Sequence, residues 1–149
     1  MIRVEVDTDI ARPIEDVFDR LTNLSDYNRW MSRRGIFLRT APTSGGPIGP
    51  GSTYYDKGRM GTAIGEVVRF NAPTRVAFSE TIRWLGLPVL QARPAYDLVA
   101  TPAGTRVHHT AEGTLYGIFK AMRPIVAVIA RGERKRTIRS LKNSLEQAR

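Results

Sequence analysis

One glutamate stands among apolar residues in the segment 76–84, where alternate residues share one face of an expected strand. Phe78 and Trp84 are the aromatic residues on the face of Glu80, and arginines and small residues occupy the other face. A carboxyl group held among apolar side chains has a raised pKa and can serve as a general base. We therefore expect Glu80 to project into an apolar cavity and to act on a small molecule there.

Two polar side chains in the following segments obey the same alternation. His109 falls on the apolar face of 105–115, and Tyr96 shares a face with Leu98. A histidine can act as a general base, and a phenol can donate a hydrogen bond to a carbonyl oxygen. We expect Glu80, His109 and Tyr96 to carry any catalysis.

The same polar residues also have a purely structural interpretation. A cross-strand arginine or a water molecule would satisfy a buried Glu80 without any ligand. Glu66 stands among apolar residues in 62–70, and a bulge there would place it at the edge of the sheet. A slip of one residue in register would turn all these side chains to solvent. The sequence leaves both interpretations open.

Residue types that the chain lacks narrow the chemistry. There is no cysteine, which excludes disulfides, thiolate nucleophiles and cysteine-bound zinc or iron–sulfur clusters. With two histidines and no acidic cluster we expect no metal site, and we expect no cofactor. A hydrophobic content of 42% excludes a disordered chain.

The length of 149 residues favours a single domain, residues 1–149, with one sizeable core. The N-terminus alternates polar and apolar residues, whereas a signal peptide carries a continuous apolar stretch. The longest apolar run, 125–130, is far shorter than the ~20 residues that cross a bilayer. We expect a cytoplasmic protein.

Strand and helix signals alternate along the chain. Residues 2–10 alternate as a half-buried strand, Pro13 begins a short helix, and 25–30 favours a second one. Turn signals then separate short strand-like runs. We expect these strands near 35–41, 51–58, 62–71, 75–84, 89–101 and 105–115. Their short connections predict an antiparallel meander.

Helical spacing returns over the last ~30 residues. Ile125 and Ile129 belong to a first apolar run, and Gly132 separates it from a second run over 138–145. The concave face of a curved sheet must be covered, so we expect this helix to lie across it. Gly132 then lies opposite the sheet and marks either close packing or room for a ligand.

Five stretches of the chain, taken in order, resemble a known family. They are Ala11–Phe18, Leu21–Trp30, Phe70–Val76, Gly104–Val107 and Ser140–Glu146. Together they are similar to the START-like or SRPBCC superfamily, and within it to the polyketide cyclase/dehydrase-like group. The resemblance spans the whole chain. It implies an α+β helix-grip fold, with a curved antiparallel sheet of about seven strands wrapped round a long C-terminal helix and two short helices between strands 1 and 2.

The resemblance also implies a function. Members of the superfamily hold a hydrophobic molecule between helix and sheet, and some catalyse cyclisation or dehydration there. It therefore implies binding or transport of a lipid, polyketide or isoprenoid, and the alternative is a metal-free cyclase or dehydratase of the lyase or isomerase type. We expect a cavity of roughly 300–1,000 Å³. The expected ligand contacts are Glu66, Phe78, Trp84, Leu98, Ile125, Ile129 and Gly132.

The net charge of +9 is concentrated near the C-terminus. Residues 120–149 contain nine basic and two acidic side chains, which gives +7. No aromatic residue stands between Arg131 and Lys142 to stack on bases, so we expect no specific nucleic-acid partner. The remaining partners that we expect are an anionic membrane, contacted weakly by this basic helix, and at most a second copy of the chain in a homodimer.

Overall fold

A computed structural model describes residues 1–31, 37–58 and 61–147. The elements in chain order are β1 (Ile2–Ile10), α1 (Ile14–Thr22), η1 (Leu24–Asp26), α2 (Tyr27–Trp30), β2 (Phe37–Pro42), β3 (Thr53–Gly58), β4 (Gly61–Asn71), β5 (Arg75–Trp84), β6 (Leu87–Thr101), β7 (Gly104–Leu115), η2 (Gly117–Met122) and α3 (Arg123–Gln147). The expected strands and helices are confirmed. Positions 35 and 36 of the strand expected near 35–41 lie outside the described residues.

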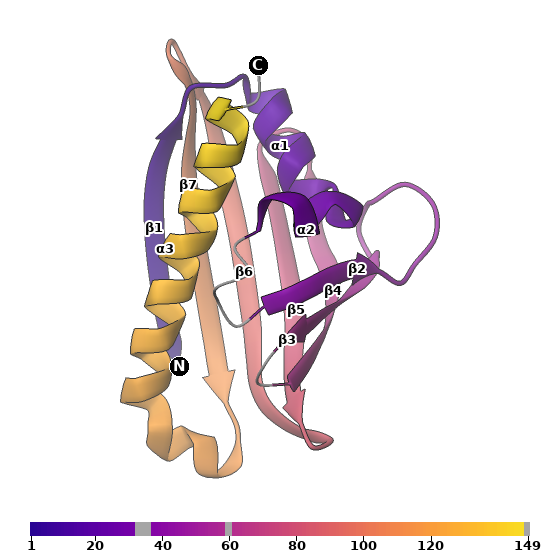
Figure 1. The fold of residues 1–149 in the computed structure, drawn as a ribbon, viewed down its shortest axis with the longest axis vertical. Coiled ribbons are helices and arrows are strands. Elements are labelled where there is room, and N and C mark those ends of the chain that lie inside the picture. The colour runs from indigo at the N-terminus through magenta and orange to yellow at the C-terminus, as the bar shows by residue number, and fades with distance from the viewer. Residues whose placement is uncertain (32–36, 59–60, 148–149) are drawn as a thin grey trace.

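The strands form one curved antiparallel sheet of seven strands in the order β1-β7-β6-β5-β4-β3-β2 (Figure 1). Strands β2 to β7 follow one another as a meander, because each connection is too short for a crossover. β1 closes the other edge by pairing with β7, from Ile2 opposite Gly113 to Ile10 opposite Thr105. The helix-grip architecture is thus confirmed.

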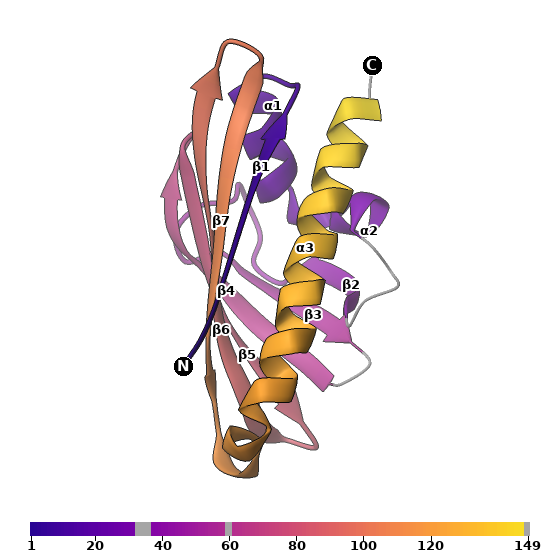
Figure 2. The same cartoon turned by 90° about the vertical axis from the view of Figure 1, so that its left-hand side faces the viewer.

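Helix α3 lies along one face of the sheet, and α1 and α2 lie at the end where α3 finishes (Figure 2). Ile138, Leu141 and Leu145 of α3 are buried in the main core with α1, α2 and the central strands. The first half of α3 packs on a smaller cluster around Ile2 and Leu115. No helix in the described part of the chain is both long and apolar enough to span a membrane.

The first half of α3 faces the sheet with a different side of the helix from the one predicted. Ile125 and Ile129 are 57% and 44% exposed, and a Cβ atom on Gly132 would meet no atom within 4 Å. Val126 and Ala130 pack on the sheet instead. Adjacent residues of a helix point about 100° apart. The buried stripe contains Val126 and Ala130, one position after Ile125 and Ile129, so Ile125, Ile129 and Gly132 lie outside it. The expectation that Gly132 lies opposite the sheet is therefore wrong.

Candidate ligand-binding site

A pocket lies between the first half of α3 and the sheet, and we call it the α3 pocket. Its outer part has a volume of about 90 Å³ and its inner part about 30 Å³. The outer part is lined by Ile2, Val4, Glu80, Ile82, Leu90, Ala92, Pro94, Ala111, Glu112, Gly113, Val126, Ala130, Glu133 and Arg134. The inner part is lined by Leu24, Tyr27, Met31, Tyr54, Asp56, Phe78, Glu80, Pro94, Tyr96 and Arg134. The two parts share Glu80, Pro94 and Arg134, so they adjoin each other at these residues.

The α3 pocket is smaller than the 300–1,000 Å³ that we expected. Aromatic rings occupy its inner end: the rings of Tyr54 and Phe78 pack edge to face at 5.7 Å, and those of Phe78 and Tyr96 at 6.3 Å. These rings fill the space that a large ligand would need, which confines the remaining volume to the side of α3.

Two buried carboxyl groups meet where the parts of the pocket join. Glu80 from β5 and Asp56 from β3 are 5% and 8% exposed, and their side chains are hydrogen-bonded to each other. The Thr40 hydroxyl donates to Asp56 Oδ1, and the Tyr54 hydroxyl donates to Glu80 Oε2 at 3.3 Å. The prediction that Glu80 points into the interior is confirmed.

A glycine between the two strands makes this approach possible. β4 separates β3 from β5, and Gly65 pairs with Tyr54 on one side and with Glu80 on the other. A Cβ atom on Gly65 would lie 2.3 Å from the Tyr54 ring. Because Gly65 has no side chain, the Tyr54 ring extends across β4 to Glu80.

Burial favours the protonated form of this carboxyl pair. Burial raises the pKa of Glu80 well above 4.5, and the charge and hydrogen bond of Asp56 raise it further. Burial also raises the pKa of Asp56, but the bonds that Asp56 accepts from Glu80 and Thr40 oppose that rise. Two close carboxyl groups in a buried site cannot both ionise, so the pair keeps a proton, and the pKa of Glu80 is raised well above its ordinary value.

Arg134 brings a positive charge from α3 to the same place. It lines both parts of the pocket, and its charge opposes the rise that burial causes in the pKa of Glu80, of Asp56 and of Tyr96. Its neighbour Glu133 accepts a hydrogen bond at Oε1 from Arg136 Nη1, at 2.5 Å. A buried acid pair beside an arginine can bind a carbonyl, hydroxyl or carboxylate oxygen of a ligand.

Tyr96 lies where the sequence predicts it, on a buried face with Leu98. It lines the inner part of the α3 pocket, and burial raises its pKa, so the phenol keeps its proton. Its ring stacks on the ring of His109 with centroids 4.3 Å apart. Tyr96 is thus a hydrogen-bond donor within the pocket.

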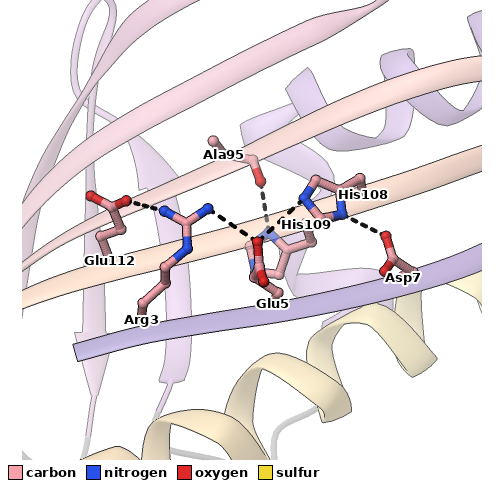
Figure 3. Close-up of polar contacts among 7 residues, drawn as sticks. All are labelled: Arg3, Glu5, Asp7, Ala95, His108, His109 and Glu112. Carbon is pink, nitrogen blue, oxygen red and sulfur yellow. Dashed lines mark hydrogen bonds and ion pairs between the residues drawn. The ribbon is translucent and has the colours of Figure 1, made fainter.

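His109 is buried as predicted, but it is not among the residues that line the α3 pocket. Its Nδ1 lies 2.9 Å from the Ala95 carbonyl oxygen (Figure 3), and its Nε2 has no hydrogen-bond partner among the described residues. Burial, with the charge of Arg134, lowers its pKa to about 3. The ring is therefore neutral and lies behind Tyr96. Its neighbour His108 points outward to Asp7, as predicted.

Two further predicted contacts face solvent. Glu66 is exposed on the outer face of β4 with Ile64 and Val68, which are 61% and 51% exposed, and the prediction that Glu66 points inward is wrong. Gly65 is one of the inward residues of β4, because the Tyr54 ring occupies the space that a side chain at this position would fill. Trp84 is 52% exposed at the end of β5, beyond the part of the strand that α3 covers.

The remaining predicted contacts divide between pocket, core and surface. Phe78 lines the inner part of the pocket. Leu98 is buried in the main core and is not among the pocket residues. Ile125, Ile129 and Gly132 lie on the exposed side of α3, so they do not face the pocket.

Sequence reasoning missed three residues of the site: Tyr54, Asp56 and Arg134. The alternation over 53–57 puts Tyr54 and Asp56 on one face, which is the same signal that identified Glu80. The sequence pattern does not distinguish Arg134 from the other basic residues of the C-terminal helix. Its spacing of four from Ala130 places it next to the inward stripe.

The fold defines a helix-grip domain. The family model described as "polyketide cyclase / dehydrase and lipid transport" matches residues 1–146. The chain therefore belongs to this family.

Solved structures share the fold at low sequence identity. A protein of Mesorhizobium loti superposes with a TM-score of 0.74 at 13% identity, covering 99% of this chain and 98% of that one. A protein of Chromobacterium violaceum gives 0.73 at 14% identity, with 97% and 96% covered. A protein of the dynemicin biosynthetic locus gives 0.71 at 15% identity; it covers 100% of this chain, which spans 49% of that protein. Comparison with the curated proteins found no significant match.

Proposed function

We propose that the protein binds an amphipathic small molecule in the α3 pocket, with the polar end of the ligand at Glu80, Asp56 and Arg134. The observation that carries this proposal is the buried pair of carboxyl groups, Glu80 and Asp56, beside Arg134 at the inner end of a mostly apolar pocket. Burying such polar groups is unfavourable unless they have partners. An oxygen-bearing ligand supplies further partners.

The residues that line the α3 pocket favour a particular ligand chemistry. Arg134 can donate a hydrogen bond to a ligand, and the carboxyl oxygens of Glu80 and Asp56 can accept one, which suits a hydroxyl group at the inner end. The apolar part of the ligand lies along the pocket wall, where Leu90 and Val126 are found. A volume of about 90 Å³ equals roughly three water molecules, so a longer ligand displaces the first half of α3 from the sheet.

An uncharged fluorescent probe, N-phenyl-1-naphthylamine, tests this proposal. The wild-type protein is expected to bind it saturably, one probe per chain. Ala130→Phe fills the outer part of the pocket and should weaken binding at least tenfold. Gly132→Phe is the matched control, because it adds the same ring two residues away on the exposed side of α3. Equal affinities of the two variants would contradict the proposal.

An enzymatic role is the second candidate, and the raised pKa of Glu80 beside a second buried carboxyl group favours it. In the dehydration of a β-hydroxy ketone, Asp56 would take the α proton while Glu80 protonates the departing hydroxyl, which leaves as water. The proton on Asp56 then returns to Glu80 through their hydrogen bond, which restores the pair.

Glu80→Gln separates the two roles. Glutamine keeps the hydrogen bonds but has no proton to give, so turnover of a β-hydroxy ketone should be lost while the affinity for the probe changes less than twofold. Absence of water loss with the wild-type protein would leave binding as its function.

A further inference from the structure

One end of the molecule carries an exposed apolar surface. Eight of the twelve exposed large apolar side chains in the described part of the chain lie in two segments, 84–87 and 118–129. They are Trp84, Leu85, Leu87, Ile118, Met122, Ile125, Val128 and Ile129. The segments form the β5–β6 hairpin and η2 with the start of α3, and both views place them at the lower end (Figures 1 and 2). We call this surface the apolar end.

Leu85 is an unexpected residue for its position. It has a φ of +53° and is followed by Gly86 with a φ of +80°, so both turn residues of the hairpin are left-handed. Asparagine, aspartate or glycine is favoured in such a turn, because a larger side chain crowds the backbone. Leu85 is 82% exposed, so no packing within the protein compensates for this. Its side chain is therefore accessible to a surface outside the chain.

The charge around the apolar end has one sign. Neither 81–96 nor 113–132 contains an acidic residue. Arg83, Lys120, Arg123 and Arg131 are exposed in these segments. A second copy of the chain would bring cations against cations. A surface with apolar depth and negative head groups satisfies both the apolar side chains and the cations.

We propose that the apolar end docks on a bilayer containing anionic phospholipid, with the β5–β6 hairpin and η2 entering the interface. Ile82, two residues before Trp84, and Val126, next to Ile125, both line the α3 pocket. Docking therefore brings the pocket to the lipid surface. The proposal rests on the surface residues and does not depend on what the pocket binds.

Vesicle co-sedimentation tests the apolar part of this proposal. The protein should bind vesicles of phosphatidylcholine mixed with phosphatidylglycerol and should bind pure phosphatidylcholine at least tenfold more weakly. Leu85→Asn combined with Ile118→Asn should lower binding to the mixed vesicles at least tenfold, and asparagine suits the left-handed turn. Ile64→Asn combined with Val99→Asn is the control, because both residues are 61% exposed and lie on the outer face of the sheet, away from the apolar end.

Charge reversal tests the electrostatic part. Lys120→Glu combined with Arg131→Glu should abolish the preference for phosphatidylglycerol, and added salt should weaken wild-type binding. Lys135→Glu combined with Arg139→Glu makes the same change further along α3 and should preserve most of the binding.

Three results would overturn the proposal: no binding of the wild type to mixed vesicles, equal binding by the apolar-end variants and their controls, or self-association of the wild type that Leu85→Asn with Ile118→Asn abolishes. The last result would assign the surface to a second copy of the chain. Because the vesicles carry no probe, these results are independent of the test of the α3 pocket.

Discussion

Glu80→Gln should stabilise the protein at neutral pH. The glutamine amide can donate to Asp56 as the protonated carboxyl does, and its oxygen can accept from Tyr54. The substitution therefore preserves the contacts of the protonated form and removes only the ability to ionise. In the unfolded chain glutamate loses its proton near pH 4.5, whereas burial and Asp56 hold the proton on Glu80 to higher pH in the folded state.

The sign and size of the effect follow from proton linkage. Above pH 4.5 the folded protein binds more protons at Glu80 than the unfolded chain, so the wild-type free energy of unfolding falls as pH rises. The fall is about 1.4 kcal/mol per pH unit for as long as folded Glu80 keeps its proton. Glu80→Gln removes this loss, so its free energy of unfolding should exceed that of the wild type by a margin that grows as pH rises above 4.5.

Urea unfolding followed by circular dichroism, between about pH 4 and pH 7, measures this difference. The two proteins should be nearly equal in stability at the acid end and diverge as pH rises. Glu66→Gln is the control, because Glu66 is exposed on the outer face of β4 and should give no divergence. Parallel curves for Glu80→Gln and wild type would refute the assignment of the proton to Glu80.

Three further substitutions test other parts of the structure. Gly65→Ala should destabilise the protein by about 1 to 3 kcal/mol, because the new Cβ would displace the Tyr54 ring; Val68→Ala on the outer face should change stability little, and equal effects would argue against this packing. Gly132→Ala should raise stability by about 0.5 to 1 kcal/mol, since the exposed site has room for a Cβ; calorimetry showing a lower melting temperature would contradict this. Burial lowers the pKa of His109 to about 3 in the folded protein, whereas a histidine of the unfolded chain takes up its proton near pH 6.5, so the free energy of unfolding falls as pH decreases from 6.5 toward 3. His109→Phe removes this protonation and should flatten the acid side of the stability curve by about 1.4 kcal/mol per pH unit. An unchanged slope would show that His109 takes up a proton as readily in the folded protein as in the unfolded chain.

The strand faces could be predicted where only one face is apolar. In β5, Val76, Phe78 and Glu80 alternate with polar or small residues, and all three are buried. In β4 both faces carry apolar residues, and the side with Ile64 and Glu66 has the larger ones. Hydrophobicity alone therefore selected the wrong face.

The correct face of β4 is set by tertiary contact. Gly65 faces inward because the Tyr54 ring occupies the space beside it. A single sequence does not show which strand lies opposite a glycine, so neither this contact nor the pairing of Asp56 with Glu80 could be predicted from it.

The side of α3 that faces the sheet could not be predicted from the sequence either. The large side chains Ile125 and Ile129 indicated the buried stripe, but the small residue Ala130 and Val126 pack on the sheet. Helix spacing gives several stripes of similar apolar character in this run, and the one chosen depends on how closely the backbone approaches the sheet. That approach places Arg134 at the carboxyl pair.

A methyl NMR titration tests the location of the binding site most directly. Protein labelled at isoleucine, leucine and valine methyl groups is titrated with N-phenyl-1-naphthylamine. We expect saturable shifts at Ile82, Leu90 and Val126, which line the α3 pocket, and little change at Leu21 and Val107 in the main core. Shifts confined to other methyl groups, or no saturable shifts at the pocket residues, would contradict the claim that the α3 pocket is the ligand-binding site.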